Sequence, residues 1–277
     1  MTSKLGLIAG GGGLPIAIAE GCRAARRPIF VVRLKGMADP SLAEFDGEDV
    51  GLAELGRCMQ VLRRSDCLSV CFAGNVRRPD FAALKPDLMA LRHLPAILAA
   101  AKRGDDALLR AALGAFEKEG FEVEGVGEAA AQLLLDPGRL GDIAPGKQDA
   151  ADAETALEAA RQLGLTDAGQ AAVVRAGRIV ATEDQGGTDG LLARCAEALG
   201  GGAALCRSGV LAKAPKPAQD RRVDLPTIGV ATVERAAAAG LAGVVGEAGA
   251  LLVVDKPAVR AAADRLGLFV FGMEARP

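Results

Sequence analysis

The chain has 277 residues, a formal net charge of −2, and neither tryptophan nor tyrosine. A net charge this close to zero gives no overall field that would recruit nucleic acid. Without tryptophan and tyrosine, few aromatic side chains are left to stack on bases. We therefore expect no nucleic-acid partner. The length is sufficient for two domains of ordinary size, each with its own core.

Histidine and cysteine usage restricts the chemistry further. His93 is the only histidine, and the cysteines contain no C-x-x-C pair. This pattern argues against a zinc site and excludes a serine–histidine triad, so acid–base chemistry must depend on carboxylates, lysine or metal-bound water. The simplest interpretation is a cytoplasmic protein with reduced, mostly buried thiols. The cysteines are Cys22, Cys58, Cys67, Cys71, Cys195 and Cys206.

Membrane-spanning segments are not expected. No apolar run approaches the roughly 18 residues that a spanning helix needs. Residues 5–20 are apolar, but glycines interrupt them, and they lack the basic start and cleavage site of a signal peptide. If a membrane matters, we expect the protein to touch it rather than cross it.

The N-terminal segment predicts a strand, a glycine turn and a helix. Residues 5–9 (LGLIA) are apolar, four glycines follow, and Pro15 stands near the first helical position, where its missing N–H costs nothing. Glycines let the backbone approach a ligand closely, and a helix N-terminus offers free N–H groups to an anion. The candidate nucleotide- or phosphate-binding residues are Gly10, Gly11, Gly12 and Gly13.

This turn fits the dinucleotide fingerprint poorly. Counting from Gly10 or from Gly11 puts Pro15 or Ile16 in the place of the third glycine. The next strand, 28–33, is followed by Leu34 and Lys35 rather than by an acid for the ribose. The pattern favours another nucleotide or a phosphate group over NAD.

A second loop comes at the end of another predicted strand. Residues 67–73 (CLSVCFA) run into Gly74-Asn75 and then into two arginines. In an open parallel sheet, ligands collect at the carboxyl ends of the strands, so Gly74 and Asn75 are candidate substrate-binding residues. An ordinary turn with solvated arginines is the alternative.

The order of the elements predicts an α/β protein of two domains. Strands alternate with helices, the latter at 94–101 and 107–119, which predicts a Rossmann-like parallel sheet over 1–134. Residues 135–149 are rich in proline, glycine and charge and are predicted to be a linker. Residues 150–277 are predicted to form a catalytic α/β domain with a mixed sheet, because strands at 170–174 and 178–182 carry a hairpin signal between them.

Two loops of the second domain carry candidate site residues. The run 183–190 (EDQGGTDG) precedes a predicted helix, which puts Thr188 or Asp189 at a helix N-terminus, with capping as the alternative role. The stretch 212–229 (AKAPKPAQDRRVDLPTIG) sets cations and carboxylates among prolines, so we expect an irregular loop rather than a central strand. Cations hold phosphate oxygens and aspartate binds hard metal ions; a solvated basic loop is the alternative.

Three pieces in this order, GLIAGGGGLP, GGTDG and KAPKPAQDRRVDLPTIG, resemble the UDP-2,3-diacylglucosamine pyrophosphatases of the LpxI type. The runs CFAGNVRRPDF and AKRGDDALLR extend the resemblance over essentially the whole chain. It implies a hydrolase of lipid A biosynthesis that cleaves UDP-2,3-diacylglucosamine into UMP and 2,3-diacylglucosamine 1-phosphate. It also implies a divalent cation, two domains with a lipid chamber between them, and water directed at the phosphorus on the sugar side.

The resemblance gives the charged residues their expected roles. Asp224 is the expected ligand of Mg²⁺ (or Mn²⁺) or the orienter of the attacking water, with a loop aspartate that caps its own backbone as the alternative, and Asp189 is the candidate for a second metal ligand. Lys213 and Arg222 are expected to hold phosphate oxygens, with Thr188 as a further donor. The two glycine-containing loops of the first domain are expected to take the uridine nucleotide.

One departure from the family pattern keeps other functions open. The family usually has a second glutamate shortly before Thr188, where this chain has Gly186, which bears on its affinity for the cation or the sugar. A carrier or sensor that holds a lipid nucleotide without cleaving it is one alternative, and a nucleotide-dependent oxidoreductase is another. The resemblance implies a lipid nucleotide substrate and a location peripheral to the inner membrane, with transient contact to its surface; a homodimer is left open.

Overall fold

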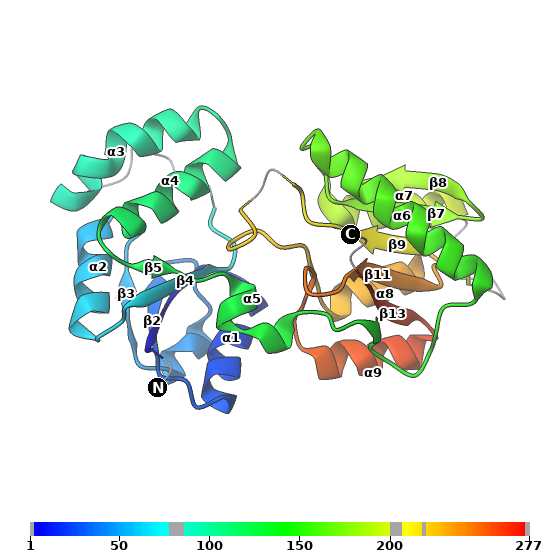
Figure 1. The fold of residues 1–277 in the computed structure, drawn as a ribbon, viewed down its shortest axis with the longest axis horizontal. Coiled ribbons are helices and arrows are strands. Elements are labelled where there is room, and N and C mark those ends of the chain that lie inside the picture. Colours follow the sequence, from blue (N-terminus) through cyan, green and yellow to red (C-terminus); the bar gives the residue numbers. More distant parts are fainter. Residues whose placement is uncertain (1–2, 78–85, 200–206, 218–219, 275–277) are drawn as a thin grey trace. The chain divides into compact units, whose positions relative to one another are not determined.

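The computed structural model describes residues 3–77, 86–199, 207–217 and 220–274. The chain divides into two compact units, Met1–Ala131 and Gln132–Pro277, and each contains a sheet with helices packed on it (Figure 1). The prediction of an α/β fold in two parts is confirmed. The division comes at residue 131, where we expected the first domain to end at 134.

The first unit is built on a parallel sheet of five strands in the order β3-β2-β1-β4-β5. β1 is buried along its whole length between β2 and β4, which explains its uninterrupted apolar sequence. The strand order reverses beside β1, between β1 and β4, and such switch points are where open α/β sheets bind ligands. The predicted Rossmann-like parallel sheet is therefore confirmed. The strands are β1 (Leu5–Ala9), β2 (Ile29–Leu34), β3 (Gly47–Val50), β4 (Ser69–Ala73) and β5 (Glu122–Val123).

Helices connect the strands of the first unit. Among them, α3 and α4, which come after β4 and before β5 in the chain, pack side by side as an antiparallel pair (Figure 1). None of the described helices, in either unit, is long and apolar enough to cross a membrane. The helices are α1 (Gly13–Ala24), α2 (Leu55–Arg64), α3 (Leu88–Ala101), α4 (Asp105–Lys118) and α5 (Val126–Ala129), with 3-10 turns at Pro40–Glu44 and Ala131–Leu133.

The second unit is built on a mixed sheet of six strands in the order β6-β13-β11-β9-β7-β8. β9, β11 and β13 run parallel, and β6, β7 and β8 are antiparallel to their neighbours. The predicted mixed sheet is confirmed. The strands are β6 (Gly138–Arg139), β7 (Ala171–Arg175), β8 (Arg178–Thr182), β9 (Val210–Lys213), β11 (Gly243–Glu247) and β13 (Phe269–Met273); β10 (Thr227–Ile228) and β12 (Leu252–Val253) form a separate parallel pair.

Both faces of this second sheet are covered. Alternate strand residues such as Leu211 and Val244 pack with three helices into one apolar core, while Ala212 and Val245 join the core beneath a single helix on the other face. Alanine-rich helices allow this close approach to the sheet. The three helices are α7 (Gly187–Leu199), α8 (Val230–Ala238) and α9 (Lys256–Leu266), and the single helix is α6 (Lys147–Leu165).

The stretch 135–149 differs from the predicted linker. Leu135 is 1% exposed, β6 pairs with β13, and α6 already begins at Lys147. These residues are therefore part of the second unit's sheet and core. Proline, glycine and charged residues predict irregular backbone, but they do not distinguish a linker between domains from irregular backbone that belongs to a single domain.

The stretch 212–229 is only partly the predicted loop. Its first residues, Ala212 and Lys213, end β9, a central strand, and its last part contains β10. We expected a loop with extended pieces rather than a central strand; the described residues between β9 and β10 are irregular, but Ala212 and Lys213 belong to a central strand, where Lys213 is accommodated by a hydrogen bond to a backbone carbonyl. Residues 218–219 lie outside the described part of the chain.

The thiols agree with the prediction as far as they are described. Cys22, Cys58, Cys67, Cys71 and Cys195 are buried and free. Burial raises the pKa of Cys58 and of Cys71 to about 12, which leaves little reactive thiolate near neutral pH. Cys206 lies outside the described residues.

Candidate functional site

The two glycine-containing loops of the first unit lie against each other. Gly10 N donates to Ala73 O at 2.8 Å, and Gly11 and Asn75 exchange backbone hydrogen bonds of 2.9 and 2.8 Å. These loops follow β1 and β4, so they meet at the switch point of the sheet. The structure thus brings together two of the predicted substrate-binding segments. Arg78, which follows the second loop, is outside the described residues.

Close contact between the two backbones explains much of the glycine content. A Cβ atom on Gly10 would lie 2.7 Å from Asn75 O, and one on Gly74, whose φ is +91°, would lie 2.6 Å from Gly11 O. Gly12 precedes α1, and within the described residues no side chain caps that helix. The first N–H groups of α1 are therefore available to an anion, which is the chemistry predicted for this turn.

Lys213 is the centre of a charged cluster in the second unit. The residue is only 6% exposed, and its Nζ donates to Thr227 O at 3.0 Å. Burial lowers the pKa of Lys213, while the charges of Glu183, Asp189 and Asp224 act in the opposite direction. Lys213 is thus a buried ammonium under the influence of three carboxylates, and electrostatic interactions of a buried charge are weakly screened.

The carboxylates around Lys213 come from different elements. Asp189 lies in the first turn of α7, and its carboxylate pairs with Arg235 of α8. Thr188 Oγ1 donates to Glu183 Oε2 at 3.5 Å, so the predicted phosphate donor lies next to an acid. The expected position of Thr188 and Asp189 at a helix N-terminus is confirmed, although the helix begins at Gly187.

Asp224 and Arg222 lie in a turn that begins at Asp220. Asp224 is half-buried, and its N–H donates to Asp220 O at 3.1 Å. The Arg222 guanidinium pairs with the Asp220 carboxylate, with Nη2 and Oδ2 2.6 Å apart. Arg222, which we expected to hold a phosphate oxygen, therefore shares its charge with a neighbour, and its role in binding stays a prediction.

Glu183 and Arg235 belong to this neighbourhood but were not singled out from the sequence. Glu183 stands at the start of the run EDQGGTDG, and its position directly after a strand was an available signal. Arg235 lies on a helix whose periodicity gives it no special place. Its pairing with Asp189 depends on the packing of α7 against α8, which local sequence does not reveal.

Asp184, an acid close to Gly186, has a hydrogen-bond donor and an ion-pair partner of its own. Asp184 accepts from Gly186 N at 2.9 Å and pairs with Arg194 at 3.0 Å. The hydrogen bond from the Gly186 backbone is the main cause that lowers the pKa of Asp184. This exposed carboxylate is thus used within its own turn and in an ion pair.

The donor set of the cluster fits a hard divalent cation in one particular way. Among the residues that the structure describes, no three acidic, histidine or cysteine side chains come close enough together to hold a metal ion alone. Mg²⁺ commonly uses one or two carboxylates and completes its shell with water and substrate phosphate oxygens. Asp189 and Asp224 are oxygen donors of that kind, so the residues fit an ion that arrives with a phosphorylated ligand.

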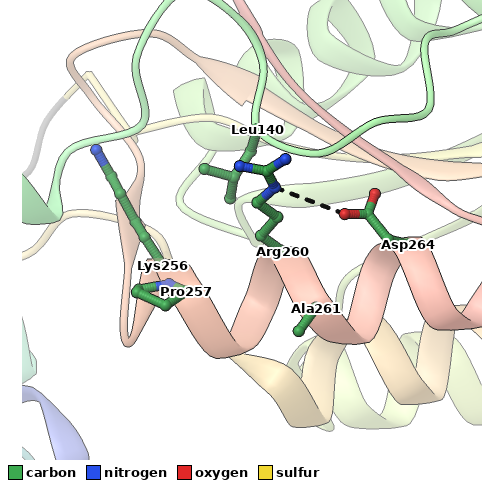
Figure 2. A pocket seen from close by; sticks show the side chains of 6 residues that line it. All are labelled: Leu140, Lys256, Pro257, Arg260, Ala261 and Asp264. Carbon is green, nitrogen blue, oxygen red and sulfur yellow. Dashed lines mark ion pairs between the residues drawn. The ribbon is translucent and has the colours of Figure 1, made fainter.

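A surface cavity elsewhere in the second unit contains none of the predicted site residues. It has a volume of roughly 490 Å³ and lies along α9, where Arg260 and Asp264 are paired at 3.6 Å (Figure 2). The cations that line the cavity also pair with acids on either side of β6: Lys256 pairs with Asp136 at 2.7 Å, and Arg260 pairs with Asp142 at 2.8 Å. These pairs tie α9 to the segment around β6, so we assign the cavity no ligand.

The fold and the site define a class: a two-unit α/β protein with a buried lysine at the end of a central strand and three carboxylates whose charges act on it. Two family models match the chain, described as "LpxI N-terminal domain" over residues 4–133 and "LpxI C-terminal domain" over 136–271. The chain belongs to the LpxI family. The expected family resemblance is confirmed.

Individual proteins agree with this family assignment. The chain is 57% identical over 274 residues, 98% of either sequence, to the "UDP-2,3-diacylglucosamine pyrophosphatase LpxI" of Caulobacter vibrioides. Among solved structures, "CobK precorrin-6A reductase" is similar over 100% of this chain and 89% of its own, with 13% identity and a TM-score of 0.31. A likeness at that level supports no inference about this chain.

Proposed function

We propose that this chain hydrolyses the pyrophosphate of UDP-2,3-diacylglucosamine to UMP and 2,3-diacylglucosamine 1-phosphate (lipid X) in lipid A biosynthesis. The observation that carries the proposal is the 57% identity, over both halves, to a relative named for this activity. The cluster around Lys213 adds chemistry suited to it, because phosphoryl transfer depends mainly on positioning and on neutralising charge.

The roles of the second unit's residues follow from their surroundings. The Lys213 ammonium, held by Thr227 O, provides a buried positive charge for a phosphate oxygen. Asp224 orients the attacking water, which is directed at the phosphorus on the sugar side. Arg235 holds the carboxylate of Asp189 in place. Thr188 and Arg222 contribute further contacts to the phosphates.

The nucleotide end of the substrate is assigned to the first unit. The N–H groups at the start of α1, beside Gly12 and Gly13, favour an anionic phosphate. Gly10, Gly11 and Gly74 carry no side chains, so the two loops can lie against each other beside the start of α1. Asn75 supplies an amide next to them, a group that hydrogen-bonds well to a base or ribose.

We also propose a divalent cation, Mg²⁺ or Mn²⁺, held by Asp224 and Asp189. When bound, such an ion supplies neutralisation of phosphate charge. Turnover is expected to fall to background in excess chelator and to return when Mg²⁺ is added back. The measurement is UMP release against chelator concentration, and full activity in excess chelator would remove the cation from the mechanism.

Turnover in labelled water tests the proposed reaction directly. The protein is incubated with UDP-2,3-diacylglucosamine in H₂¹⁸O, and the products are analysed by mass spectrometry. We expect UMP without label and 2,3-diacylglucosamine 1-phosphate with one ¹⁸O atom. Intact substrate that remains bound, with no UMP, would favour a carrier or sensor, for which Gly186 is the supporting feature.

A further inference from the structure

Helix α3 of the first unit exposes several large apolar residues in addition to those that it packs inward. Its buried positions are Ala90, His93, Ala100 and Ala101. Leu88, Leu91 and Leu98 are instead 87%, 47% and 38% exposed. Large aliphatic side chains normally fill the interior, so three exposed leucines on one helix point to contact with something outside the unit.

The exposed leucines lie on one face of α3. At 3.6 residues per turn, positions 88, 91, 95 and 98 fall within about a quarter of the helix circumference. Pro95, between the leucines, is exposed as well. The opposite side of α3 packs against α4 and α2, so the apolar face is directed away from its neighbours.

Between Asp87, the N-cap of α3, and Asp105, the charge along this helix has one sign. Residues 88–103 contain three cations and no acid, in a chain whose overall net charge is −2. Arg92, Lys102 and Arg103 are exposed and border the apolar face. Aliphatic side chains flanked by arginine and lysine are the pattern of helices that lie in the interface of an anionic membrane.

A cavity at the edge of the same face adds positive lining. It has a volume of roughly 410 Å³ between α3 and α4, and its lining includes Arg92, Lys118 and Glu119. Glu119 is already shared between Arg63 and Arg92, at 3.3 and 3.5 Å. Its negative charge is thus offset, which leaves this edge suited to an anionic headgroup.

We propose that the face of α3 formed by Leu88, Leu91, Pro95 and Leu98 docks on an anionic lipid surface. The inference deepens the proposed function, because an enzyme whose substrate is a diacylated sugar nucleotide meets that substrate at a bilayer. Each methylene group buried in the lipid surface contributes favourable binding free energy, and each nearby cation adds electrostatic attraction that salt weakens.

Vesicle sedimentation tests this assignment. The parent is mixed with phosphatidylcholine vesicles that do or do not contain phosphatidylglycerol, and so are two variants. The test variant is Leu88→Ser with Leu91→Ser, and the control is Leu68→Ser, which changes an equally apolar, 70% exposed residue of the same unit outside α3. Circular dichroism and Tm check that each variant is folded.

We expect the parent and Leu68→Ser to sediment with the anionic vesicles, and the double variant to partition at least ~10-fold less. Replacing Arg92 and Lys102 with Gln should remove the preference for phosphatidylglycerol. A parent that ignores anionic vesicles, or a double variant that binds them equally, would overturn the proposal. A parent dimer that the double variant dissociates, without vesicle binding, would assign the face to a second copy instead.

Turnover of substrate dispersed in detergent micelles separates this proposal from the proposed activity. The double variant should keep the parent's rate there, since neither leucine belongs to the site. No turnover by parent or variant would defeat the proposed activity and leave the vesicle result standing. A double variant that has lost micellar turnover while remaining folded would show that the leucines do more than dock, and would contradict our assignment.

Discussion

Lys213 carries a charge into the interior of the second unit. A buried ammonium is costly without compensation, and here it has a backbone carbonyl acceptor and three carboxylates whose charges reach it. Burial lowers the pKa of Lys213 in spite of these carboxylates, so keeping the ammonium charged costs the folded state free energy. A lysine kept in this position is therefore better explained by its chemistry than by stability.

Lys213→Met should lower kcat by about 10²–10³-fold, because it removes a preorganised charge from the site. The Tm should stay equal or rise, since the lowered pKa of Lys213 means that its charge costs the folded state free energy, and methionine removes that cost. Steady-state turnover and thermal unfolding check both parts. Lys216→Met is the matched control, because Lys216 pairs with Asp167 at 2.9 Å, away from the cluster. Turnover of Lys213→Met within a few-fold of the parent would refute the role.

Some residues of the candidate site could be predicted from the sequence, and others could not. Lys213, Asp189 and Asp224 stand in segments whose composition and family resemblance mark them, and the structure places their charges within reach of one another. Arg235 was missed because an ion pair between two helices depends on how those helices pack. The pairing of Arg222 with Asp220 was missed for a different reason, since a loop's own turn geometry decides it.

Among the elements, the contact between the two glycine-containing loops is the most demanding. Both backbones approach closely enough to exchange hydrogen bonds, and a side chain at Gly74 would meet Gly11 O and Pro15. The positive φ of Gly74 adds backbone strain for any other residue. The loops are thus fixed by sterics before any ligand binds.

Gly74→Ala should destabilise the protein by about 3 kcal/mol or more, through overpacking and backbone strain. Gly114→Ala is the matched opposite: it lies within α4, a Cβ atom there has no neighbour within 4 Å, and the gain should be about 0.5–1 kcal/mol. Urea unfolding measures both free energies. Equal stability of the two variants would show that the loop contact is not restrictive.

Strands could be predicted from the sequence where their local pattern is clear, and were missed where their position in the sheet outweighs that pattern. β1 is recognisable because both its faces are buried, and β7 with β8 because a hairpin turn joins them. β3, by contrast, has the polar sequence GEDV and pairs at the sheet edge, so it carries no apolar pattern to detect. β9 was missed because its charged last residue looks like loop until its hydrogen-bond acceptor is known.

At the scale of the whole molecule, each unit has its own core and its own ion pairs, whose carboxylates make stability depend on pH. In the first unit, Arg27 and Glu124 form a largely buried bidentate pair, with distances of 2.8 and 2.6 Å. Burial tends to raise the pKa of Glu124, but hydrogen bonds from Arg27 and Ser69 outweigh it and lower the pKa. A lowered folded-state pKa means stabilisation above the ordinary value of about 4.3, lost as the pH falls through the folded value.

Glu124→Gln should therefore cost stability near pH 7, and the difference from the parent should shrink toward about pH 3. Denaturant unfolding of both proteins at the two pH values checks this. Glu122→Gln, an exposed change in β5 just before Glu124, should show no such pH-dependent difference. A parent–variant gap that grows on acidification would contradict the assignment of the lowered pKa.

The overall architecture was the most predictable level. Alternation of strands and helices determined the α/β class, and the hairpin determined that the second sheet is mixed. The extent of the second unit was harder, because β6 and the buried Leu135 are embedded in a stretch whose composition resembles a linker. The pairing of β6 with β13 and the hydrogen bond from Leu135 N to Leu251 O, both to partners more than a hundred residues later, show where these residues belong.

The most direct test of the central claim compares the parent with Asp224→Asn in the hydrolysis of UDP-2,3-diacylglucosamine. Asp136→Asn is the control, since it removes the same charge from an exposed pair with Lys256. We predict that Asp224→Asn lowers UMP release by about 10²–10³-fold while Asp136→Asn and the parent agree within a few-fold. UMP release by folded Asp224→Asn at the parent's rate would contradict the account.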